Sequence, residues 1–287
     1  MATQVKAPVK AIDYMYYYLT PKIKGEWETA KKAEIVCRME LAVSGGLPSQ
    51  SPEEMISLMD ESGMDRVFLC SCIMFSYWQK QVIMPDTTED IAKAVKKYPK
   101  RFVGMASYNP YRIKESLQTI EKAAKEYGFK GVYVHIYGFD MPLTDARMYP
   151  LYAKCQELDI VVSMQVGYVL EAMPSEHARP ILLDRIALDF PGLKIIGSHT
   201  GYPWEEELIA VCYKHDSIYF GADAHRPKYW NESVKRNINS RLQDKAIFGT
   251  NGLPWKMMLQ DVEDLGLREE SKKKLLRDNA VKLFKLE

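Results

Sequence analysis

Four side chains that can carry or orient a proton stand at the ends of apolar runs. His135 and His199 each end such a run, and Asp223 and His225 follow another. An imidazole titrates near neutrality, so it can act as acid or base, and a carboxylate can orient it. We therefore predict catalytic roles for His199, His135 and Asp223, and a substrate contact for His225. The alternatives are structural histidines bonded inside the fold, and an Asp223 that caps a helix starting near Pro227.

Aromatic side chains gather after several of the same runs. The residues are Tyr14, Tyr16, Tyr17 and Tyr18 after the first run, Phe75, Tyr77 and Trp78 after the second, and Tyr137 and Tyr168 after later ones. Such a gathering favours a site for a flat, partly apolar ligand. We predict substrate contacts for Tyr17, Trp78 and Tyr168. Ordinary loop packing is the alternative.

Short β-rich runs alternate with longer amphipathic segments along the chain. We predict eight strands, at 11–14, 66–71, 102–107, 131–135, 160–165, 194–199, 217–221 and 246–250. Most of these runs are almost continuously apolar, as strands buried on both faces are. Helical patterns lie between them; one starts at Ser51-Pro52, with serine as N-cap and proline at the first helical position.

Eight strand–helix units in 287 residues have the number and size of a (β/α)₈ barrel. A doubly wound open sheet is the rival, but the glycine-rich turn typical of its first strand is missing after Ile12-Asp13. No linker interrupts the pattern. We predict one α/β barrel domain over 1–287, with 16–51 inserted in the first βα loop and a C-terminal helix over 269–287.

Composition limits the classes of function. The 39 Lys and Arg residues nearly balance 38 Asp and Glu, so a general nucleic-acid-binding face is not expected. No apolar run reaches the roughly 20 residues of a membrane-spanning helix. The N-terminus has no apolar signal core, so secretion is not indicated. The chain has five cysteines, an odd number, and we interpret them as reduced thiols of a cytoplasmic protein. We expect a cytoplasmic protein that binds a small molecule, with no nucleic-acid or membrane partner; a homo-oligomer is left open.

Six short motifs occur in an order that is more specific than any one of them. They are Ala11-Ile12-Asp13, Gly131-Val132-Tyr133-Val134-His135, Phe190-Pro191-Gly192-Leu193-Lys194-Ile195-Ile196, Ser198-His199-Thr200-Gly201, Ile247-Phe248-Gly249-Thr250 and Asn279-Ala280-Val281-Lys282-Leu283-Phe284. Over most of its length the chain resembles the amidohydrolase-related group that includes aminocarboxymuconate semialdehyde decarboxylase and the pyrone dicarboxylate lactonases. This resemblance implies a distorted (β/α)₈ barrel with its site at the C-terminal ends of the strands.

The resemblance also implies a metal site, which this sequence does not reproduce. The family's first strand reads Ile-Asp-x-His-x-His, with both histidines on a divalent metal, where this chain has Met15 and Tyr17. Gln165 replaces a histidine ligand of the fifth strand, and Asn251 an aspartate ligand of the eighth. Of the functional residues that the resemblance implies, His199 alone is kept. At its position the resemblance implies an acid or base beside the metal. Because zinc requires imidazole, thiolate or carboxylate ligands, we expect no catalytic metal and no cofactor.

The altered positions suggest changed chemistry. Met15, Gln165 and Asn251 are predicted to contact substrate, the two amides by holding an oxyanion; filling the space of lost ligands is the alternative. We predict a metal-independent, lactonase-like hydrolase of a small carboxylated or aromatic ring compound, with His199 as general acid or base. Decarboxylation ranks lower because the family's decarboxylases rely on their metal. The competing hypothesis is a catalytically inactive barrel that serves as a ligand-binding or assembly subunit.

Overall fold

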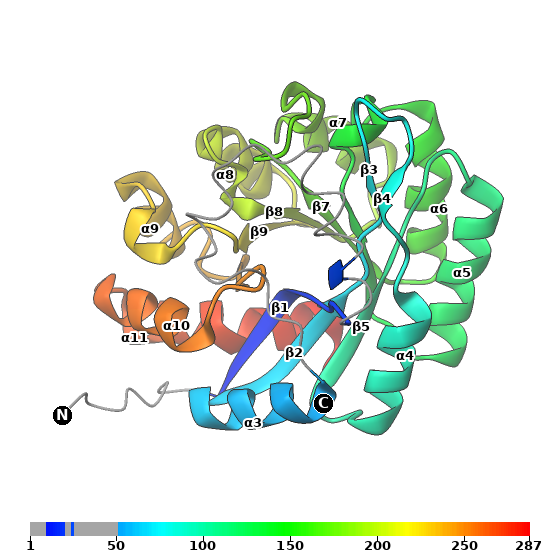
Figure 1. Ribbon diagram of the computed structural model, residues 1–287. Coiled ribbons are helices and arrows are strands. Elements are labelled where there is room, and N and C mark those ends of the chain that lie inside the picture. Colours follow the sequence, from blue (N-terminus) through cyan, green and yellow to red (C-terminus); the bar gives the residue numbers. More distant parts are fainter. Residues whose placement is uncertain (1–9, 21–23, 26–50) are drawn as a thin grey trace.

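Eight parallel strands form the interior of the protein, as the sequence predicts. The computed structural model describes residues 10–20, 24–25 and 51–287. Each strand pairs with its neighbour in chain order in one sheet, and the ring of strands is visible in Figure 1. The strands are β1 Ala11–Tyr17, β2 Met64–Cys70, β5 Phe102–Ser107, β6 Gly131–Val134, β7 Val161–Gln165, β8 Ile195–Ser198, β9 Ile218–Ala222 and β10 Ala246–Phe248.

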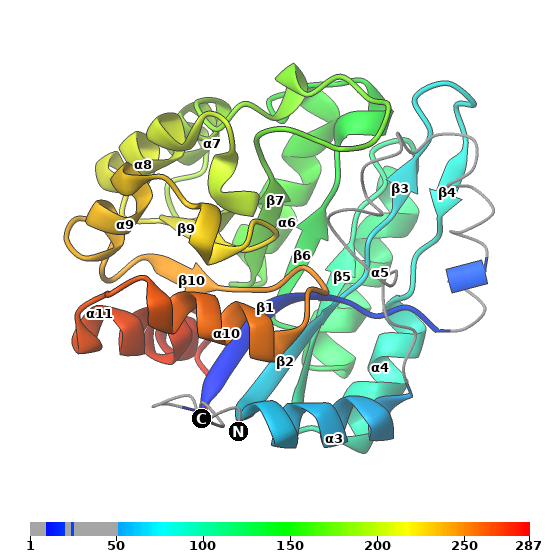
Figure 2. The same ribbon diagram turned by 60° about the vertical axis from the view of Figure 1, so that its left-hand side comes forward.

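Helices surround the strands, as the two views in Figures 1 and 2 show. They are α3 Pro52–Ser62, α4 Thr88–Lys97, α5 Ile113–Glu126, α6 Tyr149–Glu157, α7 Leu182–Asp189, α8 Glu205–Lys214, α9 Glu232–Ile238, α10 Trp255–Asp264, α11 Glu269–Lys273 and α12 Asn279–Phe284. A small antiparallel hairpin of β3 Met74–Phe75 and β4 Val82–Met84 follows β2. This alternation of parallel strand and helix is a (β/α)₈ barrel.

Local sequence explains where these elements begin. The strands β5, β6, β7 and β8 are buried along their whole length, which matches their continuous apolar runs. Helix α3 starts as predicted: the Ser51 side chain accepts a hydrogen bond from the Glu54 amide, and the Glu54 carboxylate accepts one from the Ser51 amide at 2.8 Å. This capping box satisfies two free amides of the first turn. Gly63 ends the helix with φ 76°.

One buried carboxylate joins the first strand of the barrel to the segment after the last. Asp13 accepts hydrogen bonds from the Thr250 amide at 3.0 Å and its hydroxyl at 2.5 Å, and from the Trp255 indole at 2.8 Å. The Met15 amide adds a fourth at 3.0 Å. The Asn251 amide also donates to the Met15 carbonyl at 2.9 Å. These bonds close the barrel at the strand ends where chemistry is expected.

The C-terminal segment from Glu269 packs against β10 and against the first strands of the barrel. A π-helical turn at Lys274–Asp278 links α11 to α12, and the Phe284 ring lies 4.3 Å from the Phe68 ring of β2. Arg277 donates to the Lys10 carbonyl and pairs with Asp65, both at 2.8 Å. The predicted insertion over 16–51 falls mostly outside the described residues. Among those described, no helix is long and apolar enough to cross a membrane.

Asp13→Ala should reduce the free energy of unfolding by about 3 kcal/mol, because it leaves several buried donors without an acceptor. Urea denaturation followed by circular dichroism measures this change. Asp216→Ala is the control, since Asp216 is fully exposed, and it should change stability by less than about 0.5 kcal/mol. Equal effects of the two substitutions would contradict the role of Asp13 in closing the barrel.

Candidate active site

A buried histidine–aspartate pair lies at the C-terminal ends of β8 and β9. The His199 ring donates from Nδ1 to Asp223 Oδ2 at 2.6 Å, and the His199 amide donates to Asp223 Oδ1 at 2.9 Å. Asp223 is fully buried and His199 is 6% exposed. Asp223 therefore orients the imidazole and does not cap the helical turn at Pro227. No described residue bonds the second ring nitrogen, Nε2, so it remains available for a ligand.

The surroundings of Asp223 favour its charged form. Burial by itself would raise the pKa of Asp223, but the charge of His199 and the hydrogen bonds from His199 and Tyr14 outweigh burial. The pKa of Asp223 is consequently lowered. A charged Asp223 accepts the hydrogen bond from His199 Nδ1 and fixes the direction of the ring, as a histidine that transfers a proton requires.

The residues that follow three neighbouring strands, β8, β9 and β10, include non-glycine residues with a left-handed backbone conformation. His199 has φ 65°, Ala224 φ 65° and Asn251 φ 56°, and Thr200 follows His199 with φ 55°. Non-glycine residues with positive φ are uncommon, and such strain concentrates at functional sites. Here the left-handed turn accompanies the two-point attachment of His199, by its amide and its ring, to one carboxylate.

Two polar side chains in this region have buried atoms for which the described part of the chain offers no hydrogen-bond partner. They are both ring nitrogens of His135 and the Oδ1 atom of Asn251. Burial and the nearby charge of His199 lower the pKa of His135 to about 3, and the same two causes lower that of His225 to about 4. Both rings are thus neutral at pH 7. Unpaired buried polar atoms are rare in proteins, and they mark where a ligand or water binds.

Gln165 ends β7 within a second hydrogen-bonded group. Its Oε1 accepts from the Tyr133 hydroxyl at 3.0 Å, and the Tyr133 and Tyr17 hydroxyls are 3.1 Å apart. Gln165 lies beside Ser198 in the pairing of β7 with β8, one residue before His199. Because its oxygen is occupied, the Gln165 NH₂ group is the part left to donate to a ligand.

The remaining predicted residues lie in two places. Met15 is fully buried, and its carbonyl binds the Asn251 amide. At the rim, the Tyr202 ring lies 5.0 Å from the His225 ring and 6.5 Å from the Tyr168 ring. Tyr168 is 42% exposed. Trp78 is 64% exposed in the turn of the β3–β4 hairpin, outside this aromatic group.

Sequence reasoning missed two residues of the site. Glu171, in the loop after β7, has its pKa raised by burial, while the charge of His199 acts in the opposite direction. An acidic residue shortly after a strand end was the available signal. Tyr14 was assigned only to an aromatic group, yet its ring lies inside the barrel and its hydroxyl donates to Asp223. Nothing in the local sequence indicates that contact.

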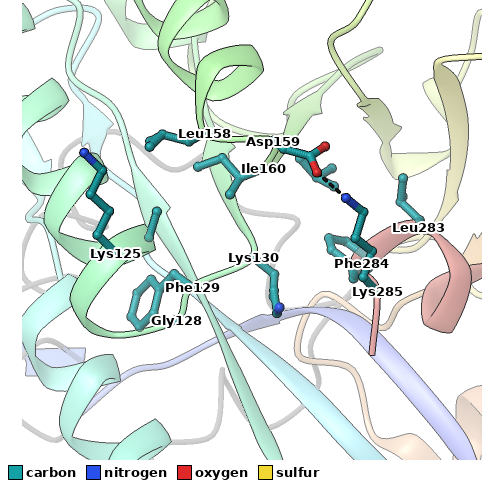
Figure 3. A pocket seen from close by; sticks show the side chains of 12 residues that line it. Lys125, Gly128, Phe129, Lys130, Leu158, Asp159, Ile160, Leu283, Phe284 and Lys285 are labelled. Carbon is teal, nitrogen blue, oxygen red and sulfur yellow. Dashed lines mark hydrogen bonds and ion pairs between the residues drawn. The ribbon is translucent and has the colours of Figure 1, made fainter. Parts of the chain in front are cut away.

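A cavity of about 270 Å³ lies away from these strand ends, between the start of β6, the start of β7 and the C-terminal residues (Figure 3). Its Asp159 pairs with Lys194 at 2.7 Å and also with Lys285. Lys125 on its rim pairs with Glu121. The starts of barrel strands contribute to stability and not to catalysis. We therefore assign the chemistry to the His199 end.

Comparisons with known proteins agree with this architecture. The sequence profile of the amidohydrolase family matches residues 49–286. The 2-amino-3-carboxymuconate-6-semialdehyde decarboxylase of Dictyostelium discoideum is 26% identical, over 82% of this chain and 77% of that protein. The chain belongs to the amidohydrolase family, in the group similar to this decarboxylase.

Solved structures share the fold. An uncharacterized TIM-barrel protein from Bordetella bronchiseptica superposes with a TM-score of 0.74 at 24% identity, covering 97% of this chain and 99% of that one. The 5-carboxyvanillate decarboxylase of Novosphingobium aromaticivorans, complexed with manganese, gives 0.73 at 16% identity and coverages of 98% and 97%. The dihydroxybenzoic acid decarboxylase of Polaromonas, also with manganese, gives 0.72 at 17%, with 97% of both chains covered. At these identities the similarity shows the fold alone.

The residues of this chain do not fit a catalytic metal. At the positions implied as ligands it offers a thioether, a phenol and two neutral amides, from Met15, Tyr17, Gln165 and Asn251. Burial raises the pKa of Tyr17 well above its ordinary value, so its phenol stays protonated. Asp223 already accepts three hydrogen bonds. Within the described part of the chain, no group of three His, Cys, Asp or Glu side chains could hold a metal ion.

The depressed histidine pKa values predict that His135 and His225 each contribute a loss of stability in acid. Unfolded histidine takes up a proton near pH 6.5, whereas native His135 and His225 do so near 3 and 4. At these two positions the unfolded state binds more protons in this window, so their contribution to the free energy of unfolding falls as pH drops from 6.5. Burial raises the pKa of Asp13 to about 7, and Asp13 therefore contributes in the opposite direction. Each group contributes at most about 1.4 kcal/mol per pH unit. Urea denaturation at several pH values measures the slope.

His135→Asn should reduce that slope by the contribution of one group, whatever it does to the absolute stability. His215→Asn is the matched control, because His215 pairs with Asp184 at 2.6 Å outside the site. A His135→Asn slope equal to that of the unsubstituted protein would contradict a buried, neutral His135.

Proposed function

We propose that this protein is a carboxy-lyase that decarboxylates a small aromatic or unsaturated carboxylic acid, with His199 as the proton donor and without a catalytic metal. The observation that carries the proposal is the buried His199–Asp223 pair, whose Nε2 atom has no partner among the described residues. The relatives support decarboxylation over the lactone hydrolysis that the sequence favoured, because the named relative and two of the similar structures are decarboxylases.

The reaction needs one proton at one carbon. The bond between the ring carbon and the carboxylate breaks, CO₂ leaves, and a C–H bond forms at that carbon with a proton from His199 Nε2. Asp223 stabilises the imidazolium before the transfer, and water returns a proton to His199 afterwards. General acid catalysis by a positioned side chain contributes about 10²- to 10⁴-fold to rate.

The unpaired atoms indicate what the substrate carries besides its carboxylate. Asn251 Oδ1 accepts hydrogen bonds only, and a neutral His135 ring offers one acceptor and one donor. A carboxylate has no donor to give them. A hydroxyl or amino group on the substrate would supply the donor that Asn251 Oδ1 lacks. The names of the relatives' substrates, 2-amino-3-carboxymuconate semialdehyde and dihydroxybenzoic acid, contain both kinds of group.

Hydrogen-bond donors and aromatic rings in the mouth can bind the substrate. The Gln165 NH₂ group is placed to bind the substrate's carboxylate or oxyanion, and the rings of Tyr168 and Tyr202 offer flat surfaces for its ring. Decarboxylation removes a charge from the substrate, and a site built from neutral amides and phenols favours the less charged product side of that step.

CO₂ release from 2,6-dihydroxybenzoate, 5-carboxyvanillate and benzoate tests the proposal. We expect release from a hydroxylated acid and none from benzoate. His199→Gln should lower the rate at least about 100-fold with the fold retained, while the control His215→Gln should keep the rate. Hydrolysis of a lactone without CO₂ release from any acid would replace the proposal with a hydrolase. Binding of the acids without turnover would replace it with a ligand-binding barrel.

A further inference from the structure

The ring of Tyr14 crosses the barrel interior from β1 toward β9 and the end of β10, in space that two glycines leave open. A Cβ atom at Gly221 of β9 would overlap the Tyr14 hydroxyl. A Cβ atom at Gly249, just after β10, would lie 2.8 Å from Tyr14 Cε1 and 2.9 Å from Asp223 Cβ. Glycine inside or beside a strand commonly marks such a close approach.

The Tyr14 hydroxyl ends a chain of hydroxyl groups that leads to the carboxylate. Tyr14 donates to Asp223 Oδ1, and its oxygen lies 3.0 Å from Ser198 Oγ. Ser198 Oγ is 2.6 Å from Ser163 Oγ. Tyr14 has one hydroxyl proton and Asp223 is charged, so the proton lies toward Asp223. Ser198 then donates to Tyr14, and Ser163 donates to Ser198.

The chain sets the direction in which the carboxylate points. Asp223 Oδ1 is held by the Tyr14 hydroxyl and the His199 amide, which leaves Oδ2 facing His199 Nδ1. Without the Tyr14 hydroxyl, Asp223 Oδ1 would accept a hydrogen bond only from the His199 amide. The carboxylate could then rotate, and the imidazole that depends on it would lose its fixed direction.

We propose that Tyr14 is a positioning residue that acts through Asp223 to hold the Nε2 atom of His199 toward the substrate. All five groups of this network are fully or almost fully buried, so each hydrogen bond is made without competition from water. Gly221 and Gly249 contribute to this positioning, because a side chain at either position would displace the Tyr14 ring. The proposal rests on one part of the proposed function, namely that His199 transfers a proton to the substrate.

Nuclear magnetic resonance of ¹⁵N-histidine-labelled protein tests the positioning without any substrate. The downfield Nδ1–H signal of His199 is assigned by its loss in His199→Gln. Tyr14→Phe keeps the ring and removes only the hydroxyl. It should shift this signal and increase the exchange of its proton with water about tenfold, the effect of losing one charge-assisted hydrogen bond. Tyr152→Phe is the matched control.

Tyr152 is also fully buried, and its hydroxyl donates to the Leu143 carbonyl at 2.7 Å away from the pair. Both variants should lose comparable stability in urea denaturation, but only Tyr14→Phe should change the His199 signal. An unchanged signal in Tyr14→Phe, or an equal change in Tyr152→Phe, would overturn the proposal. Because this readout involves no turnover, its result stands whether or not the protein decarboxylates an acid.

A double-mutant cycle adds a catalytic readout once a substrate is turned over. Tyr14→Phe should lower kcat about 10- to 100-fold with KM unchanged. In the Asp223→Asn background the same substitution should have no further effect on kcat, because Tyr14 acts through the carboxylate. Additive effects of the two substitutions would overturn the proposal.

Discussion

The arrangement of the site depends on one buried negative charge. An isolated carboxylate in a protein interior is strongly unfavourable, so Asp223 requires donors that are fixed in place. It has three, from the His199 ring, the His199 amide and the Tyr14 hydroxyl. The left-handed backbone at His199 accompanies its two contacts with Asp223. The absence of side chains at Gly221 and Gly249 leaves room for the Tyr14 ring. The hydrogen bonds that satisfy this charge thus also hold the ring of His199, our proposed proton donor, in place.

Most other polar side chains at this end of the barrel are neutral, and this distinguishes the chain from the metal-binding pattern that its family resemblance implies. Amides stand at the ends of β7 and β10 at Gln165 and Asn251, and Tyr17 remains protonated. His135 and His225 are kept uncharged by burial and by the charge of His199. In our proposal, the His199–Asp223 pair lies among mostly neutral polar groups, where an anionic acid binds and is protonated at carbon.

The sequence predicted the barrel well because continuous apolar runs report burial on both faces of a strand. All eight runs form strands, with ends that differ by up to three residues. The link between Asp223 and His199 was also within reach, since neighbouring strands end at the same edge. The contacts of Tyr14 were not, because they join residues about 200 positions apart across the barrel interior. The direction of a side chain there depends on packing, and only Gly221 and Gly249 hinted at it.

We propose that His199 and Asp223 carry out acid–base catalysis without a catalytic metal. The most direct measurement combines metal analysis of protein purified without chelator with CO₂ release from its substrate before and after chelation. We expect the analysis to find well below one equivalent of transition metal per chain, and we expect a rate that neither chelation nor added manganese changes. Stoichiometric metal, with activity lost on chelation and restored by manganese, would contradict it.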